Sequence, residues 1–299
     1  MTTTGVNMKT VRVDPAALPV AIIGANGMLG GELLKACTRS DFPVTALDLP
    51  KFNLTNHEDV AYQLKKIAPR YVLNAAAYTD VDGCEEHPGL ANAINGEAVG
   101  VLANVCRDIG AVVVHYSTDY VFDGKDPAGY AEDAVPNPVS AYGKSKLSGE
   151  RLLQASGCCY LLIRTSWLFG PGRRDNVVEK IITRAKQDGK LKLVNDRWGK
   201  PTYAVDLAKK TVALMVAGND EKGIHHLTND TPTTGITWYE FGKEIMKLLG
   251  LDTELEACSS AEFPQKAVRP MYSLLASTRE QPLRPWQEAL AEYVKIRST

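Results

Sequence analysis

A tyrosine and a lysine four residues apart form the first pair that could do acid–base chemistry. In Tyr142-Gly143-Lys144-Ser145-Lys146, the side chains of Tyr142 and Lys146 share one face of the helix predicted over 140–155. A phenol with an ordinary pKa near ~10 transfers protons poorly at neutral pH, and a nearby ammonium brings that pKa toward a useful range. Such pairs also occur on solvated helix faces, so the assignment depends on the neighbouring motifs.

A glycine-rich turn precedes this pair in the chain. Gly24, Gly27 and Gly30 stand between an apolar strand at 19–23 and a helical pattern that runs to Cys37. Glycines in such a turn let a phosphate approach the backbone, and the N-terminus of the helix offers N–H donors and positive potential. The alternative is an ordinary turn between a strand and a helix. The residues predicted to contact a dinucleotide here are Gly24, Asn26, Gly27, Met28, Leu29 and Gly30.

An acidic residue follows at the distance that a ribose site requires. Asp48 lies at the end of the next apolar strand, 18 residues after Gly30, where its carboxylate can accept hydrogen bonds from ribose hydroxyls. A carboxylate there repels a 2′-phosphate and favours NADH, unless the nearby Lys51 compensates for that charge. Both NADH and NADPH therefore remain open as cofactors.

Hydroxyl and carboxyl groups follow a later apolar strand, which spans 111–116. Ser117-Thr118-Asp119-Tyr120 would stand at the carboxyl edge of a parallel sheet, where Thr118 could donate a hydrogen bond to a substrate oxygen beside Tyr142. The alternative is a plain turn at the end of the strand. His115 is interpreted as a packed strand residue and is left out of the site.

Apolar strands and amphipathic helices alternate through the first half of the chain and would position these motifs. The pattern predicts an α/β fold: a Rossmann-like, doubly wound parallel sheet with helices on both faces. We expect a flexible leader over 1–18, a dinucleotide-binding domain over 19–170 and a smaller, mainly substrate-binding lobe over 171–299. A segment of that lobe near 200–217 is expected to return to the first domain. A long loop from Asp123 to Val139 lies where ligands commonly bind.

Composition excludes several other classes of protein. The 299 residues carry 34 basic and 35 acidic side chains and a net charge of -1, which gives no field to attract nucleic acids or anionic membranes. No apolar run approaches the length of a membrane span. The six cysteines show no CxxC spacing, which favours free thiols, no structural metal and a cytoplasmic location.

Several longer segments together resemble one family. The glycine turn, Asn74-Ala75-Ala76-Ala77 and the Tyr142/Lys146 pair are similar to those of extended short-chain dehydrogenases/reductases. STDYVFDG at 117–124, RTSWLFG at 164–170, GKPT at 199–202 and RPMYS at 269–273 resemble the dTDP-4-dehydrorhamnose reductases within that group. The resemblance covers about residues 19–296, and the STDYVFDG and RTSW segments are its more specific parts.

The resemblance implies a reaction and a set of roles. The 4-keto group of dTDP-4-dehydro-β-L-rhamnose would be reduced to give dTDP-L-rhamnose. Tyr142 would donate a proton to the C4 oxygen, Lys146 would hold the nicotinamide ribose and lower the tyrosine pKa, and Thr118 would bond the same oxygen. Ala75, Ala76, Ala77 and Asn53 would contact the dinucleotide, while Thr79, Val81, Asp119, Tyr120, Trp167 and Arg197 would face the nucleotide sugar.

Some roles stay open even with this resemblance. Arg197 stands where relatives commonly have glutamine, either as a bidentate clamp on the diphosphate or as a surface charge. Trp167 could equally be a core aromatic residue, and Asn53 replaces an acid common among relatives. Some relatives carry magnesium at a subunit contact, but no ligand cluster for it is evident in the sequence. A homodimer is expected from resemblance alone.

The same scaffold is also compatible with functions other than that of the reductase. A related dehydratase would carry a glutamate after the Thr-Asp pair, where this chain has Tyr120. A related epimerase would retain its dinucleotide through catalysis, and a reductase could act on a different 4-keto deoxysugar. A non-catalytic regulatory subunit would bind a dinucleotide without turnover, but the presence of both Tyr142 and Lys146 counts against it.

Overall fold

The computed structural model describes residues 14–172, 176–218 and 223–297. Of the expected leader, residues 1–13 lie outside the described part, and Pro15–Ala17 form a short 3₁₀ turn, η1. No helix within the described ranges is long and apolar enough to span a membrane.

Six parallel strands form the main sheet, in the order β2-β1-β3-β4-β5-β10. Most of these segments are continuous apolar runs, which suits strands that are covered on both faces. The strands are β1 (Val20–Ile23), β2 (Val44–Leu47), β3 (Tyr71–Asn74), β4 (Val112–Thr118), β5 (Cys159–Thr165) and β10 (Gly223–His226). The chain reverses direction across the sheet between β1 and β3, so a crevice is expected at their carboxyl ends.

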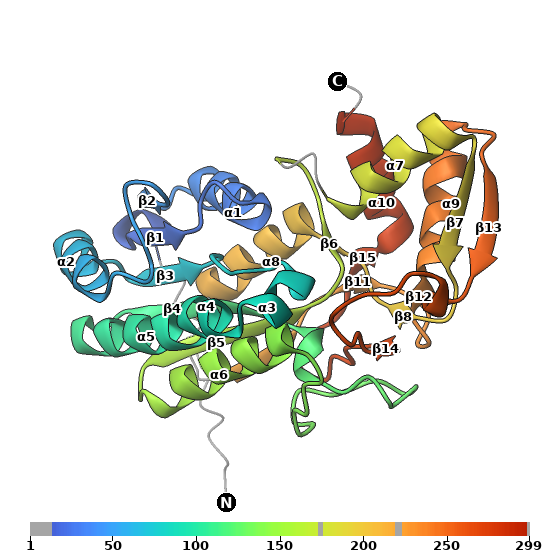
Figure 1. Ribbon diagram of the computed structural model, residues 1–299. Helices are drawn as coiled ribbons and strands as arrows, with labels where there is room; N and C mark the ends of the chain where they lie inside the picture. Colours follow the sequence, from blue (N-terminus) through green and yellow to red (C-terminus); the bar gives the residue numbers. More distant parts are fainter. Residues whose placement is uncertain (1–13, 173–175, 219–222, 298–299) are drawn as a thin grey trace, which may run out of the picture.

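Helices cover both faces of this sheet, which confirms the predicted doubly wound fold (Figure 1). On one face lie α1 (Met28–Arg39) and α8 (Ala204–Val216), whose side chains Leu33 and Leu207 share a core with Val114. On the other lie α2 (His57–Ile67), α5 (Ala98–Ile109) and α6 (Ala141–Ala155). The edge strand β10 was not predicted as a strand, because its short sequence Gly-Ile-His-His has little apolar character.

The helical stretch that ends just before β4 is broken into three parts. The chain forms α4 (Pro88–Asn92), a π-helical turn η2 (Ala93–Glu97) and then α5, and a short helix α3 (Val81–Glu86) precedes them. The π turn brings Asn95 to the base of the site, where single π turns often occur. Helical periodicity alone did not reveal this interruption.

A second cluster of elements lies past one end of the main sheet (Figure 1). Three helices surround its own core, which contains Phe169, Phe241 and Leu290: α7 (Val177–Asp188), α9 (Trp238–Leu249) and α10 (Trp286–Arg297). The remaining elements are short 3₁₀ turns and strands: η3 (Asp119–Val121), η4 (Ser260–Glu262), β6 (Leu168–Phe169), β7 (Lys190–Val194), β8 (Trp198–Gly199), β9 (Thr202–Tyr203), β11 (Asn229–Asp230), β12 (Ile236–Thr237), β13 (Glu254–Cys258), β14 (Tyr272–Ser273) and β15 (Leu283–Pro285). The division into lobes at residue 170 stays a prediction. Beyond that residue, α8 packs on the main sheet and β10 forms its edge strand.

Candidate active site

The glycine turn is packed closely enough to require glycine at two positions. Gly24 has a φ of +78°, and a Cβ there would lie 2.7 Å from the backbone nitrogen of Ala76. A Cβ at Gly30 would collide with the carbonyl oxygen of Gly24. Gly27 is the N-cap of α1 and offers no side chain to the first backbone N–H groups, so the helix start is open to an anion.

The predicted dinucleotide contacts converge around this turn. Ala75, Ala76 and Ala77 follow β3 directly, and the N–H of Ala75 donates to Ile23 O at 2.9 Å. Met28 is half-buried and Leu29 is buried at the start of α1. The close packing of Gly24 on Ala76 and the bare helix start together fit the diphosphate of a dinucleotide.

Asp48 and Asn53 lie at the end of β2 and just beyond it. The carboxylate of Asp48 accepts the N–H of Asn26 and that of Leu49, each at 2.7 Å, so it also holds the glycine turn in place. The side-chain oxygen of Asn53 accepts from Thr55 within its own turn, at 3.0 Å and 2.8 Å. Asp48 therefore lies where the sequence predicts a ribose site, whereas Asn53 has a local structural partner.

The predicted catalytic residues meet beside β4. Tyr142 lies in the first turn of α6, which Ser140 caps by accepting from Gly143 N at 3.1 Å. Thr118 ends β4 and shares a hydrogen bond with Tyr142, while its own hydroxyl donates to Asp119 Oδ1 at 2.9 Å. The structure thus brings Tyr142, Thr118 and Asp119 together at the carboxyl edge of the sheet.

The pKa of Tyr142 differs from the sequence expectation. Burial raises it first, and the charge of Asp119 raises it further, while the hydrogen bond with Thr118 acts against both. The ammonium of Lys146 does not offset this effect, because its Nζ donates to Tyr116 O at 2.6 Å instead. Tyr142 is therefore held as a protonated phenol, the form required of a proton donor.

Lys146 is almost completely buried and has few partners. It is 2% exposed, and desolvation lowers its pKa to about 8 even though the charge of Glu150 acts in the opposite direction. Its Nζ lies 3.4 Å from His115 Nε2, and no ion pair of Lys146 occurs among the described contacts. A buried ammonium with so few partners is a typical feature of a functional site.

His115 belongs to the site, although the sequence analysis left it out. Asn74 Oδ1 accepts from Ala76 N at 3.3 Å, so its amide nitrogen faces His115 Nδ1 at 3.2 Å. With this orientation of Asn74, Nδ1 accepts and the ring proton lies on Nε2, which faces Lys146. Burial and the charge of Lys146 keep the pKa of His115 well below its usual value, so the ring is neutral. The missed signal was the alternation of side chains along β4, which puts His115 on the same face as Val113, the face that α6 covers.

Asn95 is a second residue that the sequence analysis missed. Its side chain accepts from Tyr78 N at 2.8 Å and donates to Tyr78 O at 2.9 Å and Ser145 Oγ at 3.0 Å. It therefore fixes the loop after β3 to the catalytic helix. Only the π turn between α4 and α5 exposes this role, and that turn has no clear sequence signature.

Asp119 and Tyr120 follow Thr118 directly and lie beside Tyr142. Asp119 is 4% exposed, and burial raises its pKa to about 6 against hydrogen bonds from Ser273 and Thr118. Tyr120 packs edge-on against Tyr142, with ring centroids 5.7 Å apart. Its pKa is raised by burial and by Asp119, while a hydrogen bond with Arg269 and the charge of Arg197 oppose the rise. Two cations therefore lie near Tyr120.

The remaining predicted substrate residues differ in their surroundings. Thr79 is exposed and Val81 is half-buried at the start of α3. Trp167 has a φ of +46°, stacks on Trp238 with ring centroids 3.5 Å apart and lies against Gly199. An aromatic residue held in this rare backbone conformation suits a functional position, although its contact with a sugar stays a prediction.

Arg197 lies on the second cluster of elements, half-buried, and donates from Nη1 to Gln265 Oε1 at 3.4 Å. Gln265 also accepts from Arg269, whose Nη2 lies 3.0 Å from Asp82 Oδ2. Among the described residues, no three His, Cys, Asp or Glu side chains gather closely enough to hold a metal ion. The magnesium ion implied by resemblance thus has no ligand set within the described part of one chain.

The fold and the site define an oxidoreductase of the short-chain dehydrogenase/reductase class: a glycine turn at the switch point, and a tyrosine, lysine and threonine at the adjacent sheet edge. The chain also matches the family model described as the RmlD substrate binding domain over residues 19–298, and it belongs to that family.

Similar proteins extend over nearly the whole chain. A dTDP-4-dehydrorhamnose reductase of Streptomyces griseus is 39% identical over 281 residues, which cover 91% of each chain. The crystal structure of a dTDP-4-dehydrorhamnose reductase from Clostridium acetobutylicum has a TM-score of 0.89 and 37% identity, covering 94% of this chain and 100% of that one. The corresponding enzyme of Bacillus anthracis, solved in complex with NADP, has a TM-score of 0.87 and 31% identity, covering 93% of this chain and 99% of that one.

Proposed function

We propose that this protein reduces the 4-keto group of dTDP-4-dehydro-β-L-rhamnose to give dTDP-L-rhamnose, using NADH or NADPH. The observation that carries the proposal is the convergence of Tyr142, Thr118 and the buried Lys146 at the sheet edge beside the glycine turn. The names of the relatives supply the substrate, since residue types alone do not define the stereochemistry of the sugar.

The chain's own residues would manage the proton in this reaction. When bound, the nicotinamide supplies the hydride that reduces the carbonyl carbon. Tyr142 gives its phenolic proton to the carbonyl oxygen, which becomes the product hydroxyl, and Thr118 orients the phenol through their shared hydrogen bond. Lys146 contributes its positive charge to the resulting phenolate and offers N–H donors to the nicotinamide ribose.

Two arginines near Tyr120 suit the diphosphate of the substrate. Arg197 and Arg269 both act to lower the pKa of Tyr120, and both donate a hydrogen bond to Gln265. Guanidinium groups bind phosphate oxygens with paired N–H donors, which favours the clamp interpretation of Arg197 over a plain surface charge. Trp167, Thr79 and Val81 complete the proposed sugar pocket.

The related activities fit these residues less well. A dehydration needs an acid at the position of Tyr120, whose neighbours here are Tyr142 and Arg269. The non-catalytic regulatory function is disfavoured because Tyr142 and Lys146 are both present, on one helix.

A coupled absorbance assay at 340 nm tests the proposal. The purified protein is mixed with NADH or NADPH and with dTDP-4-dehydrorhamnose made in place by the preceding enzymes. We expect oxidation that depends on the sugar nucleotide and yields dTDP-rhamnose, and Tyr142→Phe should lower the rate by about 10² or more while the dinucleotide still binds. Tight dinucleotide binding without turnover would support the regulatory alternative, and turnover of another keto sugar alone would revise the substrate.

Location and assembly form the remaining part of the proposal. No disulfide occurs among the six cysteines, all of which lie in the described part of the chain, and five of them are buried, which is consistent with a reducing cytoplasm. We also infer a homodimer from the family resemblance and no nucleic-acid partner, given the net charge of -1. Light scattering of the purified protein measures the mass of the assembly directly.

A further inference from the structure

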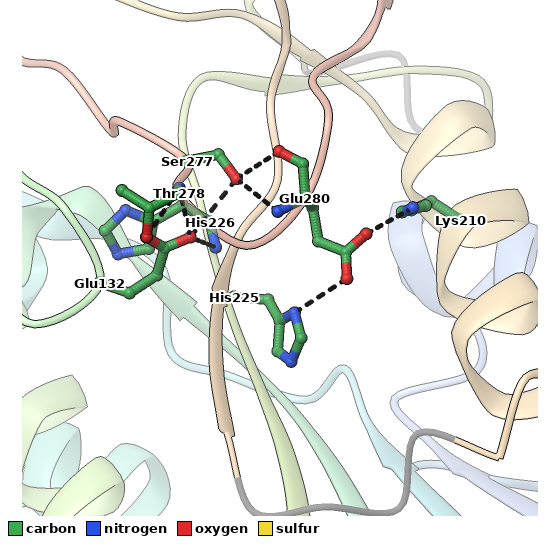
Figure 2. Close-up of polar contacts among 7 residues, drawn as sticks. All are labelled: Glu132, Lys210, His225, His226, Ser277, Thr278 and Glu280. Carbon is green, nitrogen blue, oxygen red and sulfur yellow. Dashed lines mark hydrogen bonds and ion pairs between the residues drawn. The ribbon is translucent and has the colours of Figure 1, made fainter. Parts of the chain in front are cut away.

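Glu132, in the long loop between β4 and α6, has a buried carboxylate for which the proposed reaction has no use. It is 4% exposed and accepts hydrogen bonds from two neighbouring residues, Ser277 and Thr278. Thr278 donates both its hydroxyl, at 2.7 Å, and its backbone N–H, at 3.0 Å, to Oε2. Oε1 also accepts the backbone N–H of His226 on β10 at 3.3 Å. Glu132 thus joins the loop, the edge of the main sheet and the C-terminal segment (Figure 2).

The residues just before Thr278 run directly into the active site. The 269–280 segment, as we call these residues, carries Arg269 beside Asp82 and Tyr120, and Ser273 beside Asp119. Thr278 is five positions after Ser273 in the chain, a reach of at most roughly 17 Å. A shift at Thr278 therefore passes easily to the side chains that face the substrate.

Close packing prevents this segment from shifting independently of the loop. Tyr272 N donates to Gly124 O at 3.0 Å, Tyr130 N to Leu274 O at 2.8 Å and Ala276 N to Tyr130 O at 2.8 Å. A Cβ at Gly124 would collide with Pro270, and one at Gly129 would lie 2.7 Å from Leu274 O. Loop and segment thus form one paired unit, which Glu132 fixes to the sheet.

We propose that Glu132 is a positioning residue for the reductase: by holding Ser277 and Thr278 against β10, it keeps Arg269 and Ser273 in place on the nucleotide-sugar side of the site. This inference rests on the proposed function for its kinetic consequence, but not for its structural one. We call the hydrogen bonds that Glu132 accepts from Ser277, Thr278 and His226 the anchor. Dinucleotide binding does not depend on it, because Tyr142, Lys146 and the glycine turn come from other elements.

A second carboxylate on the same segment provides a matched control. Glu280 pairs with Lys210 at 2.7 Å and His225 at 3.3 Å, on the other side of β10 (Figure 2). It lies beyond Thr278 as the chain leaves the site, so its loss should leave residues 269–276 in place. Glu132→Gln and Glu280→Gln therefore make the same chemical change on opposite sides of β10.

The experiment compares these two variants in kinetics and in amide hydrogen exchange. Glu132→Gln places an amide NH₂ against the N–H donors of Thr278 and His226. We expect KM for the nucleotide sugar to rise about tenfold, with a smaller change in kcat and dinucleotide affinity within about twofold of the wild type. In the ligand-free protein, exchange should accelerate over 270–278 but not in α6. Glu280→Gln should change none of these values by more than about twofold.

Thr278→Val keeps the protein testable if Glu132→Gln folds poorly, because Thr278 lies at the surface. It removes the hydroxyl donor and should raise KM in the same direction, whereas Thr278→Ser, which keeps the hydroxyl, should restore it. Equal effects of Glu132→Gln and Glu280→Gln, or unchanged exchange over 270–278, would overturn the anchor. If the wild type itself does not turn over the sugar nucleotide, the proposed function fails while the exchange result still decides on the anchor.

Discussion

Two buried cations lie near helix α6, and their surroundings differ sharply. Lys146 and Arg164 are each 2% exposed. Lys146 has one carbonyl acceptor, Tyr116 O, and a neutral imidazole nearby. Arg164 has a bidentate ion pair with Glu150 at 2.7 Å and 3.0 Å and also lies over the ring of Phe122. Glu150 is on the same helix as Lys146, one turn further on.

The difference separates a group held for reaction from one held for structure. A buried charge whose hydrogen bonds are satisfied is locked in one ionisation state. A buried charge with few partners has a shifted pKa, as Lys146 does, and interacts strongly with whatever enters the site. Substitution of Lys146 should therefore affect mainly activity, and substitution of Arg164 mainly stability.

Replacing the underpaired cation should give the largest effect on activity. Lys146→Met removes the charge beside Tyr142 and the donor to the nicotinamide ribose, so turnover should fall by about 10²-fold or more and dinucleotide affinity should fall as well. The free energy of unfolding should stay the same or rise by about 1 kcal/mol, because the variant no longer buries an ammonium. The 340 nm assay and urea unfolding measure the two effects on one preparation. A large loss of stability would show that Lys146 supports the fold instead.

Replacing the paired cation should reverse this pattern. Arg164→Met leaves Glu150 as an uncompensated buried carboxylate, which should cost about 3–5 kcal/mol of unfolding free energy. The double variant Arg164→Met/Glu150→Leu removes both charges and should recover most of that loss. Urea titrations of the single and double variants provide the measurement. A single variant that loses less than about 1 kcal/mol would mean that solvent reaches Glu150.

Acid should lower the free energy of unfolding, because a neutral histidine lies buried next to Arg164. His226 accepts from Arg164 Nη1 at 3.4 Å and donates from Nδ1 to Ala276 O at 3.0 Å, and burial followed by the charge of Arg164 lowers its pKa to about 4. The ordinary pKa of 6.5 applies when the chain unfolds, so the unfolded state binds more protons between those two values. The stabilisation is fully present above pH 6.5 and is lost as the pH falls toward 4, by on the order of 2–3 kcal/mol.

Thermal or urea unfolding across this pH range, compared with His226→Gln, checks the effect. The glutamine does not titrate, so its stability should fall less steeply from pH 6.5 to 4. His115, whose pKa is also lowered by burial, contributes in the same direction in both proteins and cancels in the comparison. Parallel curves for the two proteins would place the acid sensitivity elsewhere.

The residues proposed for catalysis and dinucleotide binding could be predicted from the sequence, whereas the buried carboxylates that hold the fold together could not. Gly24, Asp48, Thr118, Tyr142 and Lys146 lie within local motifs, and each motif is fixed by one strand end or one helix turn. Glu132 and Glu150 act through partners more than ten residues away, and those pairings depend on how the loop and the edge strand pack. Two-residue strands and the π turn at Asn95 likewise result from tertiary contacts and leave no periodic pattern. The direction of the pKa shift of Tyr142 was not predicted for a related reason: it is set by burial and by the charge of Asp119, which depend on the packing around the phenol.

Asp48 tests the comparison at its smallest expected effect. Its half-buried carboxylate has two backbone donors, so it is less desolvated than Glu150 yet more constrained than a free surface acid. Asp48→Ala removes a charge that would repel the 2′-phosphate of NADPH, and the ratio of kcat/KM for NADPH to that for NADH should rise by roughly fivefold, about 1 kcal/mol. Asp48→Asn keeps an acceptor for Asn26 N and serves as the control: a ratio that shifts in both variants is due to charge, because only Asp48→Ala also releases the glycine turn. A ratio that shifts in the alanine variant alone would mean that the shape of the turn, and not the carboxylate charge, selects the cofactor.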